Sequence, residues 1–135
     1  MAKYNNFIVT KEFLDSHQDV VFVFGDNLIH KGYGGAAILR DHPRAYGFIT
    51  KKYPSNEPDS FYGVTEYRDV FERELTYLEN DIKKEKNKTF YISQLGGGLA
   101  NRYKIWENVI KDGLEKALGQ HENVVFLWDE QSNHS

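Results

Sequence analysis

The stretch that decides the fold is Val20-Val21-Phe22-Val23-Phe24-Gly25-Asp26-Asn27. Its first five residues are all valine or phenylalanine, without the polar and apolar alternation of a strand that has one face in solvent. Such an unbroken run is typical of a strand buried on both faces, as in a parallel sheet covered by helices. We therefore expect residues 20–24 to form a central parallel strand that ends in a turn at Gly25-Asp26-Asn27.

Outward from this strand, apolar runs and helical periodicity alternate along the chain. We expect further strands at residues 45–50, 89–93 and 124–128, and helices at residues 35–40, 67–82 and 105–118. Proline, serine and asparagine residues make 51–63 a surface loop, which could act as a mobile flap. Alternating strands and helices imply parallel pairing through right-handed crossovers, so the expected fold class is a layered α/β sandwich.

Length and composition fit one ordinary globular domain. The chain has 135 residues, of which 40% are hydrophobic and 27% charged, so we expect a single domain over residues 1–135 with a polar tail at 130–135. No apolar run approaches the roughly 20 residues that cross a bilayer, and the start lacks a signal-peptide core. We therefore expect a cytoplasmic protein with no membrane partner. The oligomeric state is left open.

Residue types disfavour several kinds of chemistry. The chain has no cysteine, and its five histidines show no metal-binding spacing, so we expect no metal site and no bound cofactor. The net charge of −3 provides no broad positive field for nucleic acid. A phosphate ligand would therefore have to be held locally, by backbone N–H groups.

Two glycine-rich segments, at residues 32–35 and 96–98, follow expected strands and precede expected helices. Glycine at such a junction permits positive φ and close approach of a ligand, and the next helix offers unpaired N–H groups. Either segment alone is explained equally well as a structural turn. Because both should lie at the same edge of a parallel sheet, together they indicate a site for a diphosphate.

Other phosphate and nucleophile motifs are absent from the sequence. No Walker-type G-x-x-x-x-G-K-[ST] occurs, and the segment at residues 32–35 lacks the third glycine of a dinucleotide fingerprint. Neither is there a G-x-S-x-G elbow, so a nucleophilic triad has no candidate centre.

The segment from Val21 to Asn27, followed by Gly34-Gly35-Ala36-Ala37-Ile38, resembles the first ligand loop of macrodomains. The segment from Ile92 to Ala100 is similar to their second loop. The resemblance covers residues 20–128 and is closest to small, divergent macrodomain-like proteins of bacteria and phages. It implies a three-layer α/β/α sandwich with a mostly parallel mixed sheet, and a small-molecule ligand such as ADP-ribose or a related NAD-derived nucleotide.

Carried over residue by residue, the resemblance implies that Asn27 contacts the distal ribose and that the two glycine-rich loops hold the diphosphate. Asp129 would replace the adenine-reading aspartate of the family, which has no clear counterpart, although a solvated chain-end aspartate explains it equally well. The paired glutamates of poly-ADP-ribose-cleaving macrodomains are absent near Gly34. The expected ligand-binding residues are Asn27, Gly32, Tyr33, Gly34, Gly35, Ala36, Gln94, Gly96, Gly97, Gly98, Leu99, Tyr103 and Asp129.

Individual roles at this site stay open. Asp26 is either a general base or an ordinary turn residue. Tyr33 and Tyr103 either cover a ribose or base, or are surface tyrosines. Lys51 and Lys52 either reach a phosphate or are surface lysines. At Gly97, a Cβ is expected to collide with the ligand or with a backbone of positive φ.

The function expected from these patterns is the binding of ADP-ribose or a related phosphate-bearing nucleotide between the two glycine-rich loops. The first alternative is a hydrolase, in which Asp26 or Asn27 orients a water that cleaves an ADP-ribosyl bond, an ADP-ribose phosphate or an NAD-derived signalling nucleotide. The second alternative is an interaction scaffold with purely structural glycines, which binds no nucleotide.

Overall fold

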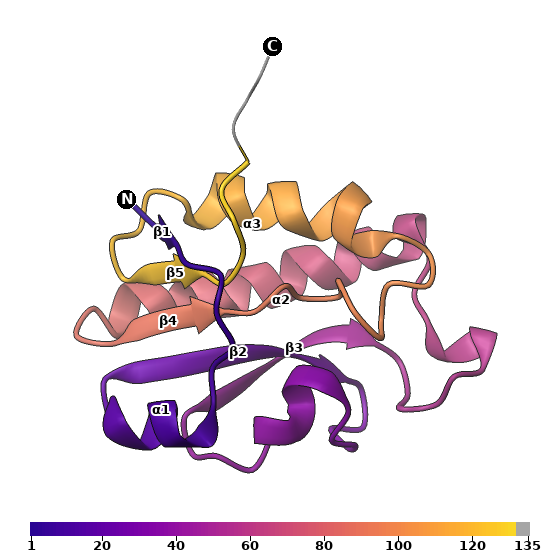
Figure 1. Cartoon of the computed structure of the whole chain (residues 1–135). Helices are drawn as coiled ribbons and strands as arrows, with labels where there is room; N and C mark the ends of the chain where they lie inside the picture. The colour runs from indigo at the N-terminus through magenta and orange to yellow at the C-terminus, as the bar shows by residue number, and fades with distance from the viewer. Residues whose placement is uncertain (132–135) are drawn as a thin grey trace.

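A computed structural model describes residues 1–131 and contains one five-stranded sheet in the order β1-β5-β4-β2-β3. The strands are β1 (Lys3–Tyr4), β2 (Val20–Asn27), β3 (Ala45–Lys51), β4 (Thr89–Ile92) and β5 (Val124–Phe126). All four strand pairs are parallel, so the mixed sheet that the resemblance implied is wrong for the described residues. The reason is that each connection crosses back over the sheet before the next strand begins (Figure 1).

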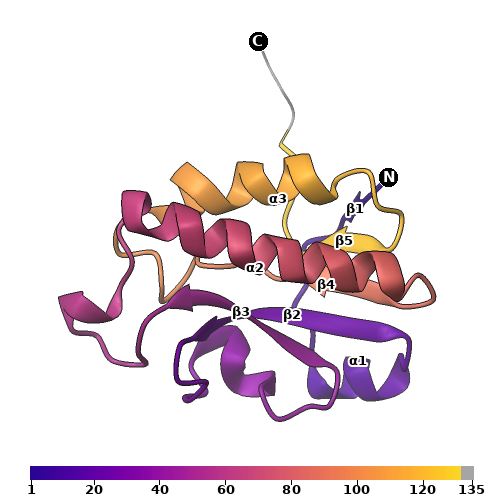
Figure 2. The ribbon, with the colours of Figure 1, turned by 180° about the vertical axis from the view of Figure 1, so that it is seen from behind.

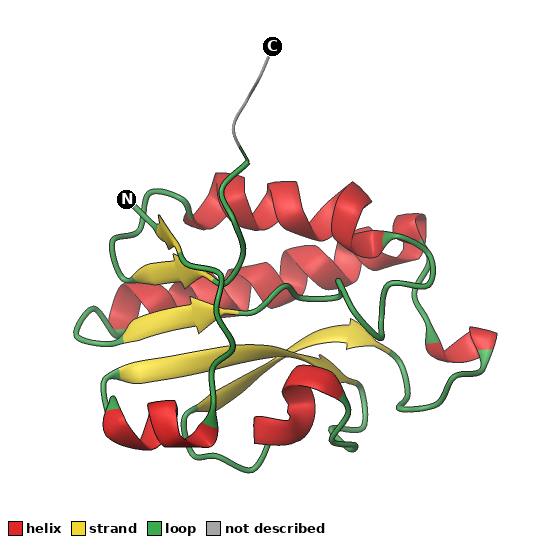
Figure 3. Ribbon diagram, viewed as in Figure 1, coloured by secondary structure: helices red, strands yellow, loops and turns green. Residues whose placement is uncertain are grey.

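Helices lie on both faces of the sheet (Figures 1 and 2). α2 (Val64–Lys84) and α3 (Lys111–Leu118) cover one face, and α1 (Lys11–Ser16) and the short 3-10 helix η1 (Gly35–Leu39) cover the other. A second 3-10 turn, η2 (Pro58–Ser60), precedes α2, and a π-helical turn, η3 (Trp106–Ile110), leads directly into α3 (Figure 3). No helix of residues 1–131 is long and apolar enough to cross a bilayer.

β2 is an inner strand, between β4 and β3, and its side chains alternate between two hydrophobic cores. Val20, Phe22 and Phe24 pack on the side of α1 and η1, whereas Val23 packs on the side of α2 and α3. Because both faces are covered, nearly every position of the strand can be apolar. The expectation of a buried parallel strand in the interior of the sheet is therefore confirmed, and β4 takes the middle position.

Most of the other expected elements are present with shifted bounds. The strand from residue 20 extends to Asn27, the expected helix at 35–40 is 3-10, and the expected helix at 105–118 begins as the π-helical turn. The sequence patterns missed β1, α1 and η2, because two, six and three residues are too few to show a period. Of the polar tail, residues 130–131 form no helix or strand, and 132–135 lie outside the described residues.

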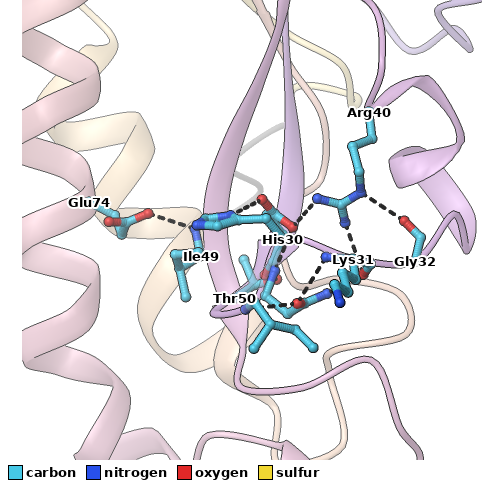
Figure 4. Close-up of polar contacts among 10 residues, drawn as sticks. His30, Lys31, Gly32, Arg40, Ile49, Thr50 and Glu74 are labelled. Atoms are coloured by element: carbon cyan, nitrogen blue, oxygen red, sulfur yellow. Dashed lines mark hydrogen bonds and ion pairs between the residues drawn. The ribbon is translucent and has the colours of Figure 1, made fainter.

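The outer edge of β3 is covered by side chains of α2. The Glu74 carboxylate accepts a hydrogen bond from the backbone N–H of Ile49 at 2.7 Å (Figure 4). The Tyr67 hydroxyl donates to the Ile49 carbonyl. An unpaired strand edge is a template for association with another chain. These two contacts satisfy backbone groups at that edge within the same molecule.

The order of the strands places a crevice at their carboxyl ends. From β2 the chain passes through η1 on one face to reach β3, whereas from β4 it passes through η3 and α3 on the opposite face to reach β5. The loops that leave the neighbouring strands β2 and β4 therefore diverge. In open parallel sheets, ligands bind at such a topological switch point.

Candidate functional site

A cleft of about 680 Å³ lies at this switch point. Its volume falls within the range of about 300–1,000 Å³ that is usual for small-molecule sites. The carboxyl ends of β2 and β4, both glycine-rich loops and part of the loop after β3 contribute to its walls. The residues that line it are Gly25, Asp26, Asn27, Lys31, Gly32, Tyr33, Gly34, Gly35, Ala36, Ala37, Arg40, Thr50, Lys51, Pro54, Asn56, Ser93, Gln94, Gly96, Gly97, Gly98, Leu99 and Ala100.

The first loop is shaped by the side chain of Asn27. Its amide nitrogen donates to the Lys31 carbonyl at 2.7 Å, and its amide oxygen accepts from the N–H groups of Ile29 at 3.2 Å and Lys31 at 3.4 Å. These bonds close a tight turn at the end of β2, in which His30 has a φ of 57°. The contacts therefore favour a loop-shaping role for Asn27, and its role toward a distal ribose stays a prediction.

Asp26 is held in an ion pair on the floor of the cleft. Its side chain is only 4% exposed, and one carboxylate oxygen lies 2.6 Å from a guanidinium nitrogen of Arg40. The other oxygen lies 2.7 Å from Nδ1 of His30. Arg40 also donates to the carbonyls of Gly32 and Lys31, so this ion pair ties the first loop to β2 (Figure 4). These contacts favour a structural role for Asp26 over that of a general base.

The three glycines of the second loop have different roles. Gly96 has a φ of 73°, and a Cβ there would lie 2.8 Å from Cδ1 of Ile110, so its backbone requires glycine for folding. At Gly97 the backbone expectation is wrong, because φ is not positive and a Cβ would first meet the side chain of Gln94, at 2.7 Å from Cγ. A Cβ at Gly98 would meet no atom within 4 Å, although this residue lines the cleft.

Both loops present backbone N–H groups that have no partner within residues 1–131. In the first loop these belong to Gly34, Gly35 and Ala36, and in the second loop to Gly96, Gly98, Leu99 and Ala100. Most of these residues are exposed, so water can satisfy the groups in the free protein. The two loops meet where the Leu99 side chain lies against Gly34, where an added Cβ would come within 2.9 Å of Leu99 Cδ1. The cleft between them is therefore lined with unpaired donors.

Lys51 and Lys52 are adjacent in sequence but have different surroundings in the structure. Lys51 lines the cleft, and burial lowers the pKa of its ammonium group. Lys52 instead forms an ion pair with Glu66 at 2.8 Å and does not line the cleft. Lys31 is a second cleft cation, and it is exposed. Of the two open alternatives for these lysines, the position of Lys51 is compatible with a phosphate contact and that of Lys52 with a surface role.

Two expected ligand-binding residues lie outside the cleft lining. Tyr103 packs edge-on against Phe61, with ring centroids 6.4 Å apart, and Asp129 accepts a hydrogen bond from Asn6 at 3.2 Å. Tyr33, Gln94 and Leu99 do line the cleft, and a hydrogen bond to Asp41 raises the pKa of Tyr33. The sequence reasoning missed Arg40, Lys31 and Asn56. The sequence did contain a signal for Arg40. Asp26 lies at the end of an expected strand and Arg40 at the end of the next expected helix, so the two could have been predicted to form an ion pair.

No group of three or more histidine, aspartate or glutamate side chains within residues 1–131 is arranged to hold a metal ion. The cleft offers unpaired backbone donors and two lysines, and its aspartate is paired internally. This combination suits the recognition of an anion.

A family model described as a family of unknown function (DUF7831) matches residues 4–103, which is more than half of the chain. The chain belongs to this family. The match runs from β1 through β4 and includes both glycine-rich loops of the DUF7831 chain. No curated protein and no solved structure matches it.

If the cleft of this DUF7831 protein binds ADP and ADP-ribose, replacement of Asn27 by alanine is expected to lower the affinity for both alike, by about tenfold. The reason is that the variant loses the bonds that hold the first loop, each worth roughly 0.5–1.5 kcal/mol. Isothermal titration with the two ligands measures the effect. A loss confined to ADP-ribose would contradict the loop-shaping role and assign Asn27 to the distal ribose.

Proposed function

We propose that this protein binds a nucleotide through its diphosphate, which lies between the two glycine-rich loops. The observation that carries the proposal is the set of unpaired N–H groups, from Gly34 to Ala36 and from Gly98 to Ala100, on opposite sides of one cleft. Donors of this kind form anion-binding concavities in proteins. Their position at the switch point between β2 and β4 is where parallel α/β sheets bind ligands.

ADP-ribose or a related NAD-derived nucleotide is the ligand class that fits the proposal best. The all-parallel sheet with helices on both faces is compatible with a three-layer, macrodomain-like sandwich, and the order of the two loops along the chain agrees with that resemblance. The cleft continues into an apolar groove of about 370 Å³ that shares Gly35, Ala36, Ser93 and Gln94 with it. A ligand longer than a diphosphate therefore has room on that side.

Binding without hydrolysis is the form of the proposal that the contacts favour. Both oxygens of the Asp26 carboxylate have partners, and the Asn27 amide is engaged by the first loop. A general base must instead be free to reach the proton that it removes. We therefore assign neither residue a catalytic role.

Nucleotides with a diphosphate are expected to stabilise the protein, whereas adenosine is not. At about 100 times its dissociation constant, ADP-ribose or ADP should add roughly 2.7 kcal/mol to the free energy of unfolding. Thermal unfolding with each ligand measures the shift, and chromatography of the same mixtures detects hydrolysis products. If no nucleotide at millimolar concentration changes the melting temperature, the scaffold alternative replaces the proposal. A new product peak would instead support the alternative that the protein is a hydrolase.

A further inference from the structure

Next to the cleft, four side chains form a group that we call the Phe61 cluster: Lys51, Phe61, Arg102 and Tyr103. The Lys51 ammonium lies 4.7 Å from the centre of the Phe61 ring, and the Arg102 guanidinium lies 5.7 Å from the same point. Arg102 is also 5.7 Å from the Tyr103 ring. Two cations therefore lie within cation–π range of the ring of one buried phenylalanine.

Neither cation of the Phe61 cluster has an acidic partner in the described chain. The ion pairs of residues 1–131 include Lys52 with Glu66 and Arg40 with Asp26, but none that involves Lys51 or Arg102. Burial lowers the pKa of Lys51, and no neighbouring charge offsets this effect. The cluster thus carries two positive charges that an anion from outside the chain would neutralise.

The cluster continues the second glycine-rich loop. Lys51 is itself part of the cleft lining, and Arg102 follows Ala100, the last residue of the loop with an unpaired N–H group, by two positions. An isolated antiparallel bridge between Lys51 and Phe61 fixes the two ends of the loop after β3 to each other. The bridge therefore fixes Phe61 next to Lys51 in the wall of the cleft, and the Phe61 ring connects Lys51 to Arg102.

We propose that the ligand carries a further anionic group beyond its diphosphate, and that Lys51 and Arg102 of the Phe61 cluster bind it. This inference rests on the proposed function, because the additional anionic group can reach the cluster only if the diphosphate lies between the two loops. The corresponding ligand class is a nucleotide with a third phosphate or with a phosphate ester on its distal end. A phosphate can form an ion pair as well as hydrogen bonds with both side chains, whereas a neutral distal group can form no ion pair with them.

The test compares ADP with ATP by isothermal titration in EDTA, so that magnesium does not neutralise the additional phosphate. Wild-type protein is expected to bind ATP about ten- to a hundredfold more tightly than ADP. The double variant Lys51→Gln/Arg102→Gln should bind both nucleotides with the affinity of wild type for ADP. The variant Lys52→Gln is the matched control, because this neighbouring lysine is paired with Glu66, and it should retain the wild-type preference.

The possible results separate this inference from the proposed function. If ADP binds and ATP binds no more tightly, or if the double variant weakens both nucleotides equally, the inference fails and the diphosphate site stands. If neither nucleotide binds wild-type protein, both fail. A single-stranded oligonucleotide that binds more tightly than ATP, and loses affinity in the double variant, would overturn the small-molecule assignment. Far-UV circular dichroism of each variant confirms that it is folded.

Discussion

Replacement of Arg40 by methionine is expected to lower the free energy of unfolding by about 3–5 kcal/mol, because it leaves the Asp26 carboxylate buried without its cation. The Asp26 side chain is 4% exposed and that of Arg40 is 11% exposed, so water cannot replace the lost partner easily. Glycine at position 47 provides the space for this carboxylate, since a Cβ there would lie 2.6 Å from Asp26 Oδ2. Urea unfolding, followed by circular dichroism and by tryptophan fluorescence, measures the loss.

Two further variants make this prediction specific to the ion pair. Lys52→Met removes a more exposed pair, with Glu66, and should cost less than about 1 kcal/mol. The double variant Asp26→Asn/Arg40→Met removes both charges, and it should recover a large part of the loss. Equal costs for Arg40→Met and Lys52→Met would show that Asp26 is solvated in solution. A double variant that folds and still binds ADP would support a structural role for Asp26.

The elements that could be predicted from the sequence are those in which many residues repeat one signal. The apolar run at 20–24 identified β2 because both faces of that strand are covered, and the spacing of Tyr67, Phe71, Leu75, Leu78 and Ile82 identified α2 because all of these side chains are buried. The meeting of the two glycine-rich loops in one cleft was also predictable, because parallel strands bring their carboxyl ends to the same edge.

What could not be predicted depends on how short segments turn in space. The pairing of Asp26 with Arg40 requires η1 to bring Arg40 back over the end of β2, and no periodicity encodes that turn. Asn27 was expected to contact the ligand from its resemblance to the macrodomain asparagine, and only the structure shows that its amide is used by the loop. Tyr103 lies next to the loop in sequence, yet its ring packs edge-on against Phe61.

The second loop illustrates the same limit at the level of single glycines. Three consecutive glycines give no sequence signal to distinguish one that the fold requires from one that a ligand requires. The structure separates them, because Gly96 is packed against Ile110, Gly97 faces the side chain of Gln94, and Gly98 is open to the cleft. The test of ligand binding therefore belongs at Gly98.

Gly98→Val is expected to lower the affinity for the diphosphate by about a hundredfold or more, while the protein stays folded. The backbone at Gly98 does not have a positive φ, and an added Cβ meets no protein atom within 4 Å, so the fold should accept the side chain. The branched methyl groups would instead occupy the space in front of the unpaired N–H groups of Gly98 to Ala100, where the diphosphate is proposed to lie. A hundredfold loss corresponds to about 2.7 kcal/mol of binding free energy.

Isothermal titration with ADP measures this loss, and thermal unfolding without ligand shows that stability is preserved. The matched control is Gly63→Val, because a Cβ at Gly63 also meets no atom within 4 Å, but this residue precedes α2 and lies outside the cleft lining. Valine at both positions loses the same backbone freedom of the unfolded chain, so only the blocked donors differ between the two variants. If Gly98→Val binds ADP as tightly as Gly63→Val does, the diphosphate does not lie against the second loop, and the glycines there serve the fold alone.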